Sequence, residues 1–470
     1  MKDEFAYRQL ENWLLQQLNQ KRWQAGDRLP SVRQLCREQQ VSKATVLHAY
    51  ERLEMIGRVE ARPRSGYFVS PDPGRLQPER QMTLQSALAP VAVNVGEVLS
   101  DIMLRGAAFD LLPRERHREE ISAGVQQLNR CIGRALRQRK GNVHQYYDEP
   151  AGYLPLRQQL AVRYSRDGCQ LSAEDFCITS GCQHALFLAL KSCCQPGDVV
   201  AVETPGFYGV LQLLEQLGLQ VLEVPASAVN GIDLDSLARA AQQWPIKACV
   251  VTPCFATPTG ALMSDEQQQR LLALAEQYDF TIIEDDIYRE LSFFGRLSPL
   301  KARDRQQRVV LCGSFSKSLS RDIRLGWVVG GCWQKQIIHL KLITQLASSR
   351  FVQQGVSEFL SEGGYDRHLR QRNAQLLQQS RDLAQVLRNL WPQEQLYFST
   401  PSGGLCLWAE WAHPVDTLAL YNSALQAGIV ITPGPLFSAS GRYANALRLS
   451  YSQPLTDERL RAIKVLKRLL

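Results

Sequence analysis

Short apolar runs alternate with helical stretches from about residue 170 onward, and this alternation restricts the fold more than any other feature. The runs FCITSG, DVVAVETPG, ACVVTPC, FTIIEDDIY and RVVLCGSFSK are separated by stretches such as HALFLALKSCC and SDEQQQRLLALAEQY. Near-continuous apolar strands with intervening helices are typical of a mainly parallel sheet that is covered on both faces. We therefore predict an α/β fold, with functional residues at the ends of its strands.

Length and composition restrict the class of protein. A chain of 470 residues with 45% hydrophobic and 21% charged residues is typical of a globular protein of roughly two to four domains. We see no run near the ~18 apolar residues of a membrane span, and the start MKDEFAYRQL lacks a signal-peptide core. The 12 cysteines form no CxxC pair and have no His partners at zinc spacing, so we expect reduced thiols, no metal and a cytoplasmic location.

The first seventy residues have the pattern of three helices and a hairpin. Apolar residues at helical spacing predict the first helix: Leu10, Trp13, Leu14 and Leu18. Ser31 with Gln34 forms a potential capping box for a second helix, and Ser42 can cap a third that ends at Gly57. The alternating stretch VEARPRSGYFV predicts two strands joined near Pro63 to Gly66.

Three helices followed by a hairpin make a winged helix-turn-helix. Residues 3–70 resemble the GntR family of bacterial DNA-binding domains. Three sequence motifs carry the resemblance, in the order GDRLPSVRQL, VSKATVLHAYERLE and RPRSGYFV. The resemblance implies that the third helix enters the major groove of double-stranded operator DNA. It also implies a set of contact residues: Arg33 and Ser42 for phosphates, Lys43, Thr45 and His48 for bases, and Arg64 with Gly66 at the wing tip.

Charge is consistent with a polyanion partner for the front of the chain. Residues 1–70 hold 12 Lys/Arg against 8 Asp/Glu, so they carry half of the net charge of +8. Residues 71–109 are proline-rich at their start and predict a linker between a 1–70 domain and a 110–470 domain. The arginine-rich segments LLPRERHREE and NRCIGRALRQRK predict helices, whose arginines are either solvated or additional phosphate contacts.

Lys317 lies in SFSKSLSRDIRLGW, and alone it would be read as a solvated charge. A pyridoxal phosphate ring needs a lysine for a Schiff base, a carboxylate at its nitrogen, a donor to its phenolate and a phosphate cradle. Asp285, at the end of TIIED, would supply the carboxylate, Tyr288 would reach the phenolate, and Phe207 would cover the ring. The cradle would come from helix-start amides, hydroxyls and an arginine: Ser180, Gly181, Cys182, Ser314, Ser316 and Arg324.

The order of these segments resembles the fold-type I aminotransferases over roughly residues 110–470. The blocks are TSGCQHAL, ETPGFYG, TPCFATPTG, EDDIYREL, SFSKSLSRDIRLGW, PSGGLCLW and ALRLSYS. The resemblance implies a large domain that binds pyridoxal 5'-phosphate (PLP) and a smaller carboxyl-terminal α/β subdomain. It also implies that Arg448 grips a substrate carboxylate and that Tyr147 reaches the cofactor phosphate of the other subunit of a homodimer.

One position departs from the aminotransferase pattern. Enzymes of this fold usually read N-P-x-G where this chain has Thr257-Pro258-Thr259-Gly260. The asparagine normally donates to the ring phenolate, and loss of one such charge-assisted bond costs about 1.5–3 kcal/mol. We expect Thr257 to permit cofactor binding while it weakens turnover.

A GntR-type head joined to an aminotransferase-like body resembles the MocR group of transcriptional regulators over nearly the whole chain. This resemblance implies a PLP-dependent, DNA-binding regulator in which a small amino acid or amine effector exchanges with Lys317 in the Schiff base. Two alternatives stay open: a working aminotransferase with an accessory DNA-binding domain, and a cofactor-free dimerisation scaffold.

Overall fold

The computed structural model describes residues 2–20, 22–24, 26–55, 58–62, 65–69, 89–91, 102, 111–112, 121–138, 147–392 and 394–470. The chain divides into two compact units, Met1–Leu84 and Gln85–Leu470. The predicted domain limits at residues 70 and 110, and most of the predicted helix LLPRERHREE, lie outside the described residues and stay predictions.

The smaller unit contains three helices and a two-stranded hairpin, as predicted. The helices are α1 (Lys2–Asn19), α2 (Val32–Gln39) and α3 (Lys43–Met55), and β1 (Val59–Arg62) pairs antiparallel with β2 (Gly66–Val69). A buried core joins them: Leu10, Leu14, Leu18, Leu29, Leu35, Val46, Ala49, Tyr50, Leu53, Val59 and Val69. The Tyr50 ring stacks on Tyr67 of β2 at 4.4 Å, and this contact packs the hairpin against α3.

Serine caps start two of these helices. Gln34 N donates to Ser31 Oγ (3.2 Å), and Thr45 N donates to Ser42 Oγ (3.1 Å). The Gln34 side chain donates to Glu38 Oε1 (2.8 Å), so it extends along α2 instead of returning to Ser31 to complete the expected box. One backbone amide at the start of α2 and one at the start of α3 are therefore satisfied by the serine caps that the sequence predicts.

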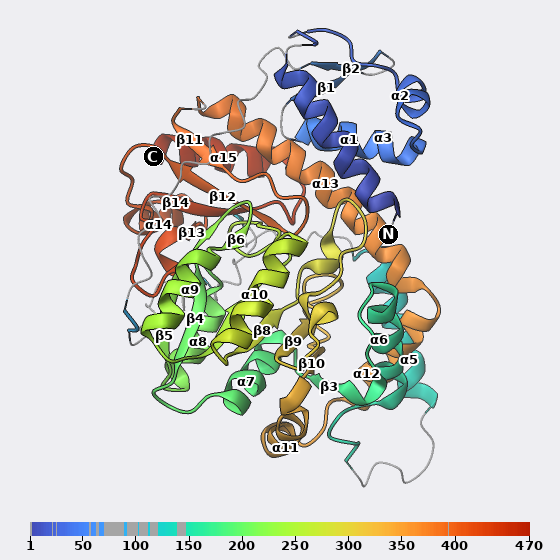
Figure 1. Ribbon diagram of the computed structural model, residues 1–470, viewed down its shortest axis with the longest axis vertical. Coiled ribbons are helices and arrows are strands. Elements are labelled where there is room, and N and C mark those ends of the chain that lie inside the picture. Colours follow the sequence, from blue (N-terminus) through green and yellow to red (C-terminus); the bar gives the residue numbers. More distant parts are fainter. Residues whose placement is uncertain are drawn as a thin grey trace. The chain divides into compact units, whose positions relative to one another are not determined.

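The larger unit is built on an eight-stranded sheet (Figure 1). The strand order is β3 (Phe176–Thr179), β10 (Gly326–Val329), β9 (Val309–Ser314), β8 (Thr281–Asp285), β7 (Ile246–Val251), β4 (Val199–Thr204), β5 (Gln220–Ser227) and β6 (Gly231–Ile232). Strands β9, β8, β7, β4 and β5 pair in parallel. Strand β10 is antiparallel to β3 and β9, and β6 is antiparallel to β5. The predicted mainly parallel sheet is confirmed.

Helices cover both faces of this sheet. Val200 and Val202 of β4 belong to a core shared with α7 (Cys182–Cys193), α8 (Tyr208–Gln216) and α11 (Gln334–Gln345). Val199 and Ala201 point to the opposite face, into a core shared with α9 (Leu234–Gln243) and α10 (Asp265–Gln277). Because successive strand residues face opposite sides, burial of both faces explains the unbroken apolar runs of the sequence.

A third group of helices packs beside β3 and β10. These are α5 (Ala123–Gln138), α6 (Leu154–Arg166) and α12 (Arg350–Ser361).

Of the helices that the structure describes, none combines the length and the apolar character that a bilayer crossing needs.

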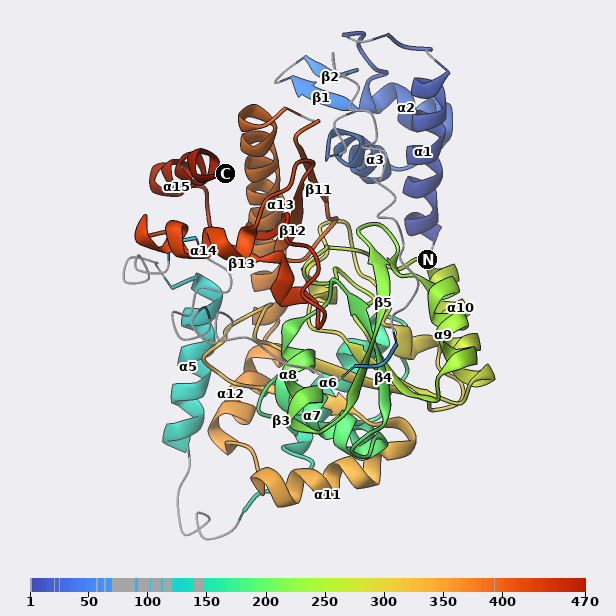
Figure 2. The same cartoon turned by 90° about the vertical axis from the view of Figure 1, so that its left-hand side faces the viewer.

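A second sheet of four antiparallel strands lies near the carboxyl terminus (Figure 2). Its order is β11 (Leu396–Phe398), β12 (Cys406–Trp411), β14 (Ala446–Ser450) and β13 (Thr432–Pro433), with α14 (Thr417–Gln426) and α15 (Asp457–Leu469) packed on it. The 27-residue helix α13 (Gly364–Leu390) joins the two sheets. Its Tyr365 packs against Phe315, which follows β9, and its Leu383 and Leu387 enter the core around the small sheet.

Candidate functional site

Lys317 lies in a turn that follows β9, at the end of the large sheet. Leu319 N donates to Phe315 O (2.9 Å), and this turn bond fixes the backbone on either side of the lysine. Burial lowers the pKa of the Lys317 amine well below 10.5, and the nearby charges of Arg321 and Arg448 lower it further, against the opposing effect of Asp285. The neutral amine favoured by this environment is the form that attacks a carbonyl carbon.

Asp285 is one of three consecutive buried carboxyls at the end of β8, and only this one faces Lys317. Glu284 accepts hydrogen bonds from the backbone amides of Leu300 (2.7 Å) and Lys301 (2.8 Å). Asp286 pairs with Arg289, whose Nε lies 2.9 Å from Oδ1. Asp285 accepts a bond from the Cys182 thiol at 3.3 Å, and burial raises its pKa to about 6. It is therefore a buried carboxylate near neutral pH that a protonated ring nitrogen would stabilise.

The predicted phosphate cradle is assembled around Arg324. The guanidinium donates to Ser180 O (2.9 Å) and to Ser316 Oγ (3.5 Å), and Ser314 Oγ lies 2.8 Å from Ser316 Oγ. Gly181 caps α7 with a φ of +90°, and a Cβ there would lie 2.7 Å from Arg324 Nη2. The positive φ favours glycine at this position. The arrangement brings a helix amino terminus, two hydroxyls and a guanidinium to one place, as an anion site needs.

Tyr288 and Thr257 are buried and are linked to Lys317 through Cys406. Tyr288 is 2% exposed and follows β8 by three residues. Thr257 Oγ1 lies 3.6 Å from Cys406 Sγ, and both side chains are buried. The charge of Lys317 acts on the Cys406 thiol, and that of Cys406 on Tyr288, so these groups lie within one electrostatic environment.

Arg448 is almost fully buried on β14, where it pairs in register with Trp408 of β12. Its guanidinium carbon lies 5.2 Å from the Phe437 ring and 5.7 Å from the Tyr208 ring. Aromatic rings around a guanidinium exclude water, and this strengthens its attraction for a carboxylate. Arg448 is thus suited to the carboxylate grip that the sequence predicts.

Of the two other predicted cofactor residues, Phe207 is partly buried and Tyr147 is exposed. Phe207 is partly buried at the start of α8, with its ring 5.0 Å from that of Tyr208. Tyr147 is 79% exposed, so within one chain it lies at the surface. Its predicted contact with the cofactor of a second subunit stays a prediction.

The assembled residues fit pyridoxal phosphate. A desolvated lysine, a buried carboxylate and a cradle closed by Gly181 are separate requirements of that group, and the fold brings all three to one end of the large sheet. Lys317, Asp285 and Arg324 would hold the aldehyde carbon, the ring nitrogen and the phosphate, respectively. Among the described residues, no cluster of His, Cys, Asp or Glu could hold a metal ion.

The predicted DNA contacts are only partly described. Arg33, Ser42 and Lys43 are exposed, on α2 and at the start of α3. Thr45 is 5% exposed, and its hydroxyl lies 2.8 Å from Ser42 Oγ. This burial favours a capping role for Thr45 over the predicted contact with bases.

The remaining predicted contacts lie at the wing and along α3. Gly66 begins β2 with a φ of +103°, as a tight wing turn requires. Arg64 and the side chain of His48 lie outside the described residues, so their predicted contacts stay predictions.

Sequence reasoning missed two residues close to Lys317. Arg321 exerts the largest effect of any charge on the lysine amine, although its side chain is exposed. Cys406 lies on the same face of β12 as Trp408, which is the register partner of Arg448. The alternation of strand residues in PSGGLCLW was a usable signal for Cys406, because it places residues 406 and 408 on one face.

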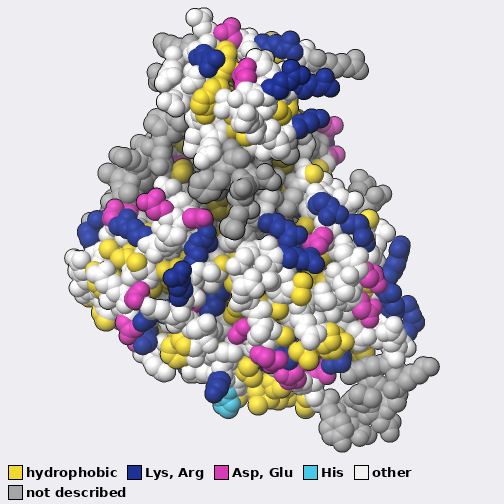
Figure 3. Space-filling model, turned by 45° about the vertical axis from the view of Figure 1, so that its right-hand side comes forward, with side chains coloured by type: hydrophobic (Ala, Val, Ile, Leu, Met, Phe, Trp, Pro, Cys, Tyr) yellow, Lys and Arg dark blue, Asp and Glu magenta, His cyan; other side chains and the backbone are white. Residues whose placement is uncertain are grey.

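An apolar surface is exposed on α11, close to the cradle. Leu342 and Ile343 are 41% and 65% exposed, and Leu346, just after the helix, is 43% exposed. Figure 3 shows hydrophobic side chains gathered at the lower end of the larger unit, where Figure 1 places α11. Gln345, between these residues, donates to the Ser180 hydroxyl, so the surface adjoins the cofactor site.

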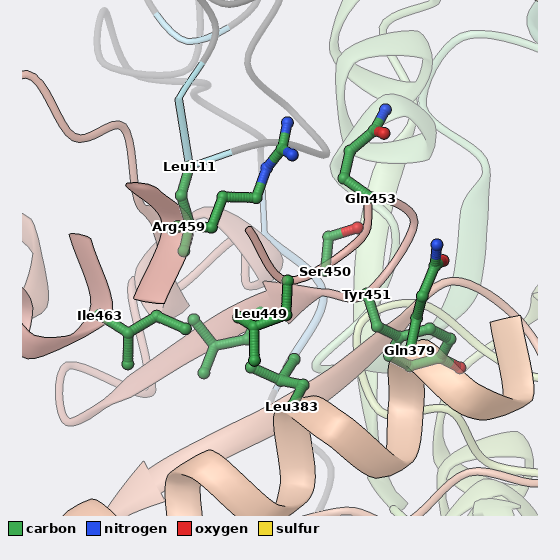
Figure 4. A pocket seen from close by; sticks show the side chains of 10 residues that line it. Leu111, Gln379, Leu383, Leu449, Ser450, Tyr451, Gln453, Arg459 and Ile463 are labelled. Atoms are coloured by element: carbon green, nitrogen blue, oxygen red, sulfur yellow. The ribbon is translucent and has the colours of Figure 1, made fainter. Parts of the chain in front are cut away.

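A separate, small pocket that opens to solvent lies in the small-sheet region between α13, β14 and α15. Leu383, Leu449 and Ile463 face one another in it, while the polar ends of Gln453 and Arg459 point away from them (Figure 4). The pocket contains none of the residues predicted for the cofactor or the carboxylate.

The chain matches known families at both ends. Residues 117–466 match the family "Aminotransferase class I and II", and residues 6–69 match "Bacterial regulatory proteins, gntR family". The HTH-type transcriptional regulator YjiR of Escherichia coli K12 is 34% identical to this chain, and the match covers 97% of both chains. The HTH-type transcriptional regulator YdcR of the same organism is 35% identical, and the match covers 99% of this chain and 98% of YdcR. The crystal structure of LysN, an alpha-aminoadipate aminotransferase from Thermus thermophilus complexed with N-(5'-phosphopyridoxyl)-L-leucine, superposes with a TM-score of 0.70 and 28% identity. The match covers 80% of this chain and 96% of LysN.

Proposed function

The chain belongs to the aminotransferase class I and II family and carries a gntR-family DNA-binding domain, and from that premise we propose that it regulates transcription in response to a small amino acid or amine bound at Lys317. It is a DNA-binding regulator with a PLP-dependent type of body. Bound at Lys317, PLP supplies an electrophilic carbon at which another amine can replace the lysine.

Each residue of the site has a defined part in this proposal. The Lys317 amine is kept neutral, so it can leave and return without first losing a proton to water. Asp285 would hold the ring nitrogen in its protonated form, and the Arg324 cradle would hold the phosphate. Arg448 binds the effector carboxylate with its planar fork, which selects amino acids over simple amines.

The single observation that carries the proposal is the meeting of four chain segments around Lys317. The segments 180–182, 285–288, 314–324 and 448 lie far apart in sequence, and their charges act on one another in the folded chain. Such a complete site, in a chain that also carries a DNA-binding unit, supports an effector that acts through the cofactor. A free-energy coupling of 1–3 kcal/mol between effector and DNA binding is typical of such regulators.

We also propose that the protein is a homodimer that binds a repeated operator. The exposed apolar residues Leu342, Ile343 and Leu346 adjoin the cradle, and Tyr147 is exposed, as a residue that serves a neighbouring subunit would be. Two DNA-binding heads would then contact two half-sites, in direct or inverted repeat. Because its partner is operator DNA, we place the protein in the cytoplasm.

A second candidate is a working aminotransferase. It is favoured by the retention of Lys317, Asp285 and Arg448 in the arrangement described above, since catalysis needs the same groups as binding. A cofactor-free scaffold would not need a desolvated Lys317 next to a buried Asp285 carboxylate.

The experiment titrates amino acids and amines into the PLP-loaded protein while the visible absorption band and operator affinity are followed together. We expect both signals to change at the same ligand concentration. Borohydride should fix the cofactor on Lys317, and Lys317→Ala should remove the band. A reduced adduct on another lysine would refute the site. Sustained conversion of an amino acid and a keto acid would favour the enzyme, and a protein without any band would favour the scaffold.

A further inference from the structure

Both polar groups of Ser318, the residue that follows Lys317, are held by helix α13. Ser318 Oγ lies 2.6 Å from Tyr365 Oη, and Ser318 O lies 3.0 Å from His368 Nε2. A carbonyl oxygen can only accept, so His368 carries its hydrogen on Nε2. Ser318, Tyr365 and His368 are all buried. Residues one turn apart on α13 therefore fix the position of the backbone next to the lysine.

Tyr365 is in turn held by Glu290. Its hydroxyl lies 2.6 Å from Glu290 Oε2, and Arg163 donates to the other carboxylate oxygen and to Asp366 Oδ1 (2.7 Å). Burial alone would raise the pKa of Glu290, but Arg163 and Arg289 outweigh it and lower the pKa. Glu290 is therefore an ionised acceptor, so the Tyr365 proton goes to Glu290 and the Ser318 hydroxyl donates to the Tyr365 oxygen.

The other side of the lysine is tied to the same tyrosine. Phe315 packs edge-on against the Tyr365 ring with centroids 5.3 Å apart, and against the Trp327 ring at 4.8 Å. Lys317 thus lies between two residues, Phe315 and Ser318, that both contact Tyr365. This tyrosine joins an ionised carboxylate to the serine beside the lysine.

Helix α13 also contacts the segments that carry the other site residues. Asn373 Nδ2 donates to Glu290 O (2.9 Å) and Ser292 O (3.0 Å), just after Tyr288 in sequence. Arg372 Nη2 donates to Ser452 O (2.7 Å), four residues beyond Arg448. Residues 365–373 of one helix therefore contact the segments that contain the lysine, the tyrosine and the arginine of the site.

We infer that Tyr365 and His368 are positioning residues for Lys317, which act through Ser318 to hold the lysine amine where it attaches the cofactor. This inference rests on the proposed function, in which the amine must leave and return to one position. It concerns the attachment step itself, so it can be measured without any effector.

The test follows the visible band after PLP is mixed with the full-length apoprotein, over a range of PLP concentrations. Tyr365→Phe keeps the ring and removes the hydroxyl. We expect the half-saturating PLP concentration to stay unchanged, because the Arg324 cradle is intact, and the limiting rate of attachment to fall about tenfold, as for other outer residues that orient a reactive group.

Ser318→Ala should produce the same fall, and the double variant should be no slower than either single variant if Tyr365 acts through Ser318. The matched control is Tyr278→Phe. The Tyr278 hydroxyl, at the carboxyl end of α10, accepts a hydrogen bond from Gln242, so this variant should attach PLP normally. If Tyr365→Phe does not fold, Ser318→Ala alone tests the inference. Unchanged limiting rates in the variants, or additive losses in the double variant, would overturn the inference.

The same measurements separate this inference from the proposed function. If the unmodified protein forms no band with PLP, both are overturned. If it attaches PLP at the expected rates but no amino acid or amine alters operator affinity, only the sensing role is overturned, and the positioning of Lys317 is decided by the variants.

Discussion

The Thr257 hydroxyl lies 3.6 Å from the Cys406 thiol, on which the charge of Lys317 acts. The N-P-x-G pattern from which this chain departs would place an asparagine at position 257, and its longer amide would be expected to donate to the cofactor phenolate. Threonine is one atom shorter, and here its hydroxyl is directed at a neighbouring thiol. We therefore expect a site that binds the cofactor and its ligands but turns over slowly.

Thr257→Asn should shift the pH midpoint of the visible band downward. An amide that donates to the phenolate stabilises its ionised form, and a bond of about 1.5 kcal/mol corresponds to about one pH unit. Absorbance titration of the PLP-loaded protein measures the midpoint. Thr259→Ser is the control, because Thr259 Oγ1 donates to Ala256 O and lies outside this contact. An unchanged midpoint in Thr257→Asn would mean that the residue at 257 does not reach the cofactor.

Lys43→Ala should weaken binding to the specific operator by about 1–3 kcal/mol and leave binding to scrambled duplex nearly unchanged, because Lys43 is exposed at the start of α3. Arg33→Ala, at an exposed position of α2, should instead weaken both and reduce the salt slope by about one. The operator can be selected from random DNA with the unmodified protein. If Lys43→Ala lost equal affinity for both duplexes, Lys43 would contact a phosphate and not a base.

Two glycines of α5 should respond oppositely to alanine. A Cβ on Gly124 would lie 2.4 Å from His368 Nδ1, whereas one on Gly133 would meet only the end of Arg137 at 3.4 Å. Gly133→Ala should therefore raise the free energy of unfolding by about 0.5–1 kcal/mol, through helix propensity. Gly124→Ala should lower it, because His368 is buried and cannot move freely. Denaturant unfolding of the full chain measures both, and stabilisation by Gly124→Ala would contradict the close approach of α5 to α13.

Much of the framework was predictable because its signals are local. The caps at Ser31 and Ser42 are formed by residues three positions apart, and the hairpin turn is specified within a few residues. Asp285 was predictable because it ends an apolar run, and parallel strands present their carboxyl ends at one edge of the sheet.

The support of Lys317 was not predictable, because it depends on docking of a distant helix. Tyr365 and His368 lie about fifty residues from Ser318 in sequence, and nothing in their neighbourhood distinguishes them from ordinary helix residues. The burial of Thr45 was not predictable for a related reason: the sequence places it on the third helix, but its burial depends on packing inside the DNA-binding unit, and its predicted base contact stays a prediction.

Glu203 should make stability depend on pH. It is buried at the end of β4, where burial raises its pKa from 4.5 to about 7, against the opposing bond from Thr252 N (3.0 Å). The folded state then holds a proton that the unfolded state releases, so the free energy of unfolding falls as pH rises from about 4.5 to about 7, by roughly 3 kcal/mol. Glu203→Gln does not titrate. The difference in unfolding free energy between the unmodified protein and this variant should therefore decrease over the same range, and a constant difference would refute the assignment.

Arg448 separates sensing of amino acids from sensing of amines. Its buried guanidinium is surrounded by the Phe437 and Tyr208 rings, so a carboxylate there is bound out of water. Arg448→Lys keeps the charge and loses the bidentate fork. We expect the midpoint of an amino-acid titration to rise about 10–100-fold, as loss of a charge-assisted pair worth about 1.5–3 kcal/mol predicts.

The matched ligand pair for this test is L-alanine and ethylamine, which differ by the carboxylate alone. The ethylamine response should be the same in the unmodified protein and in Arg448→Lys, and the PLP band should be retained in both, because the Arg324 cradle is built from other segments. Half-reactions of the unmodified protein should stay far below the ~1–10³ s⁻¹ of ordinary enzymes, since Thr257 does not supply the amide of the asparagine. An amino-acid response that survives both Arg448→Lys and Arg448→Ala would mean that the effector is recognised without its carboxylate or outside this site. Rapid turnover would instead assign the same arginine to catalysis.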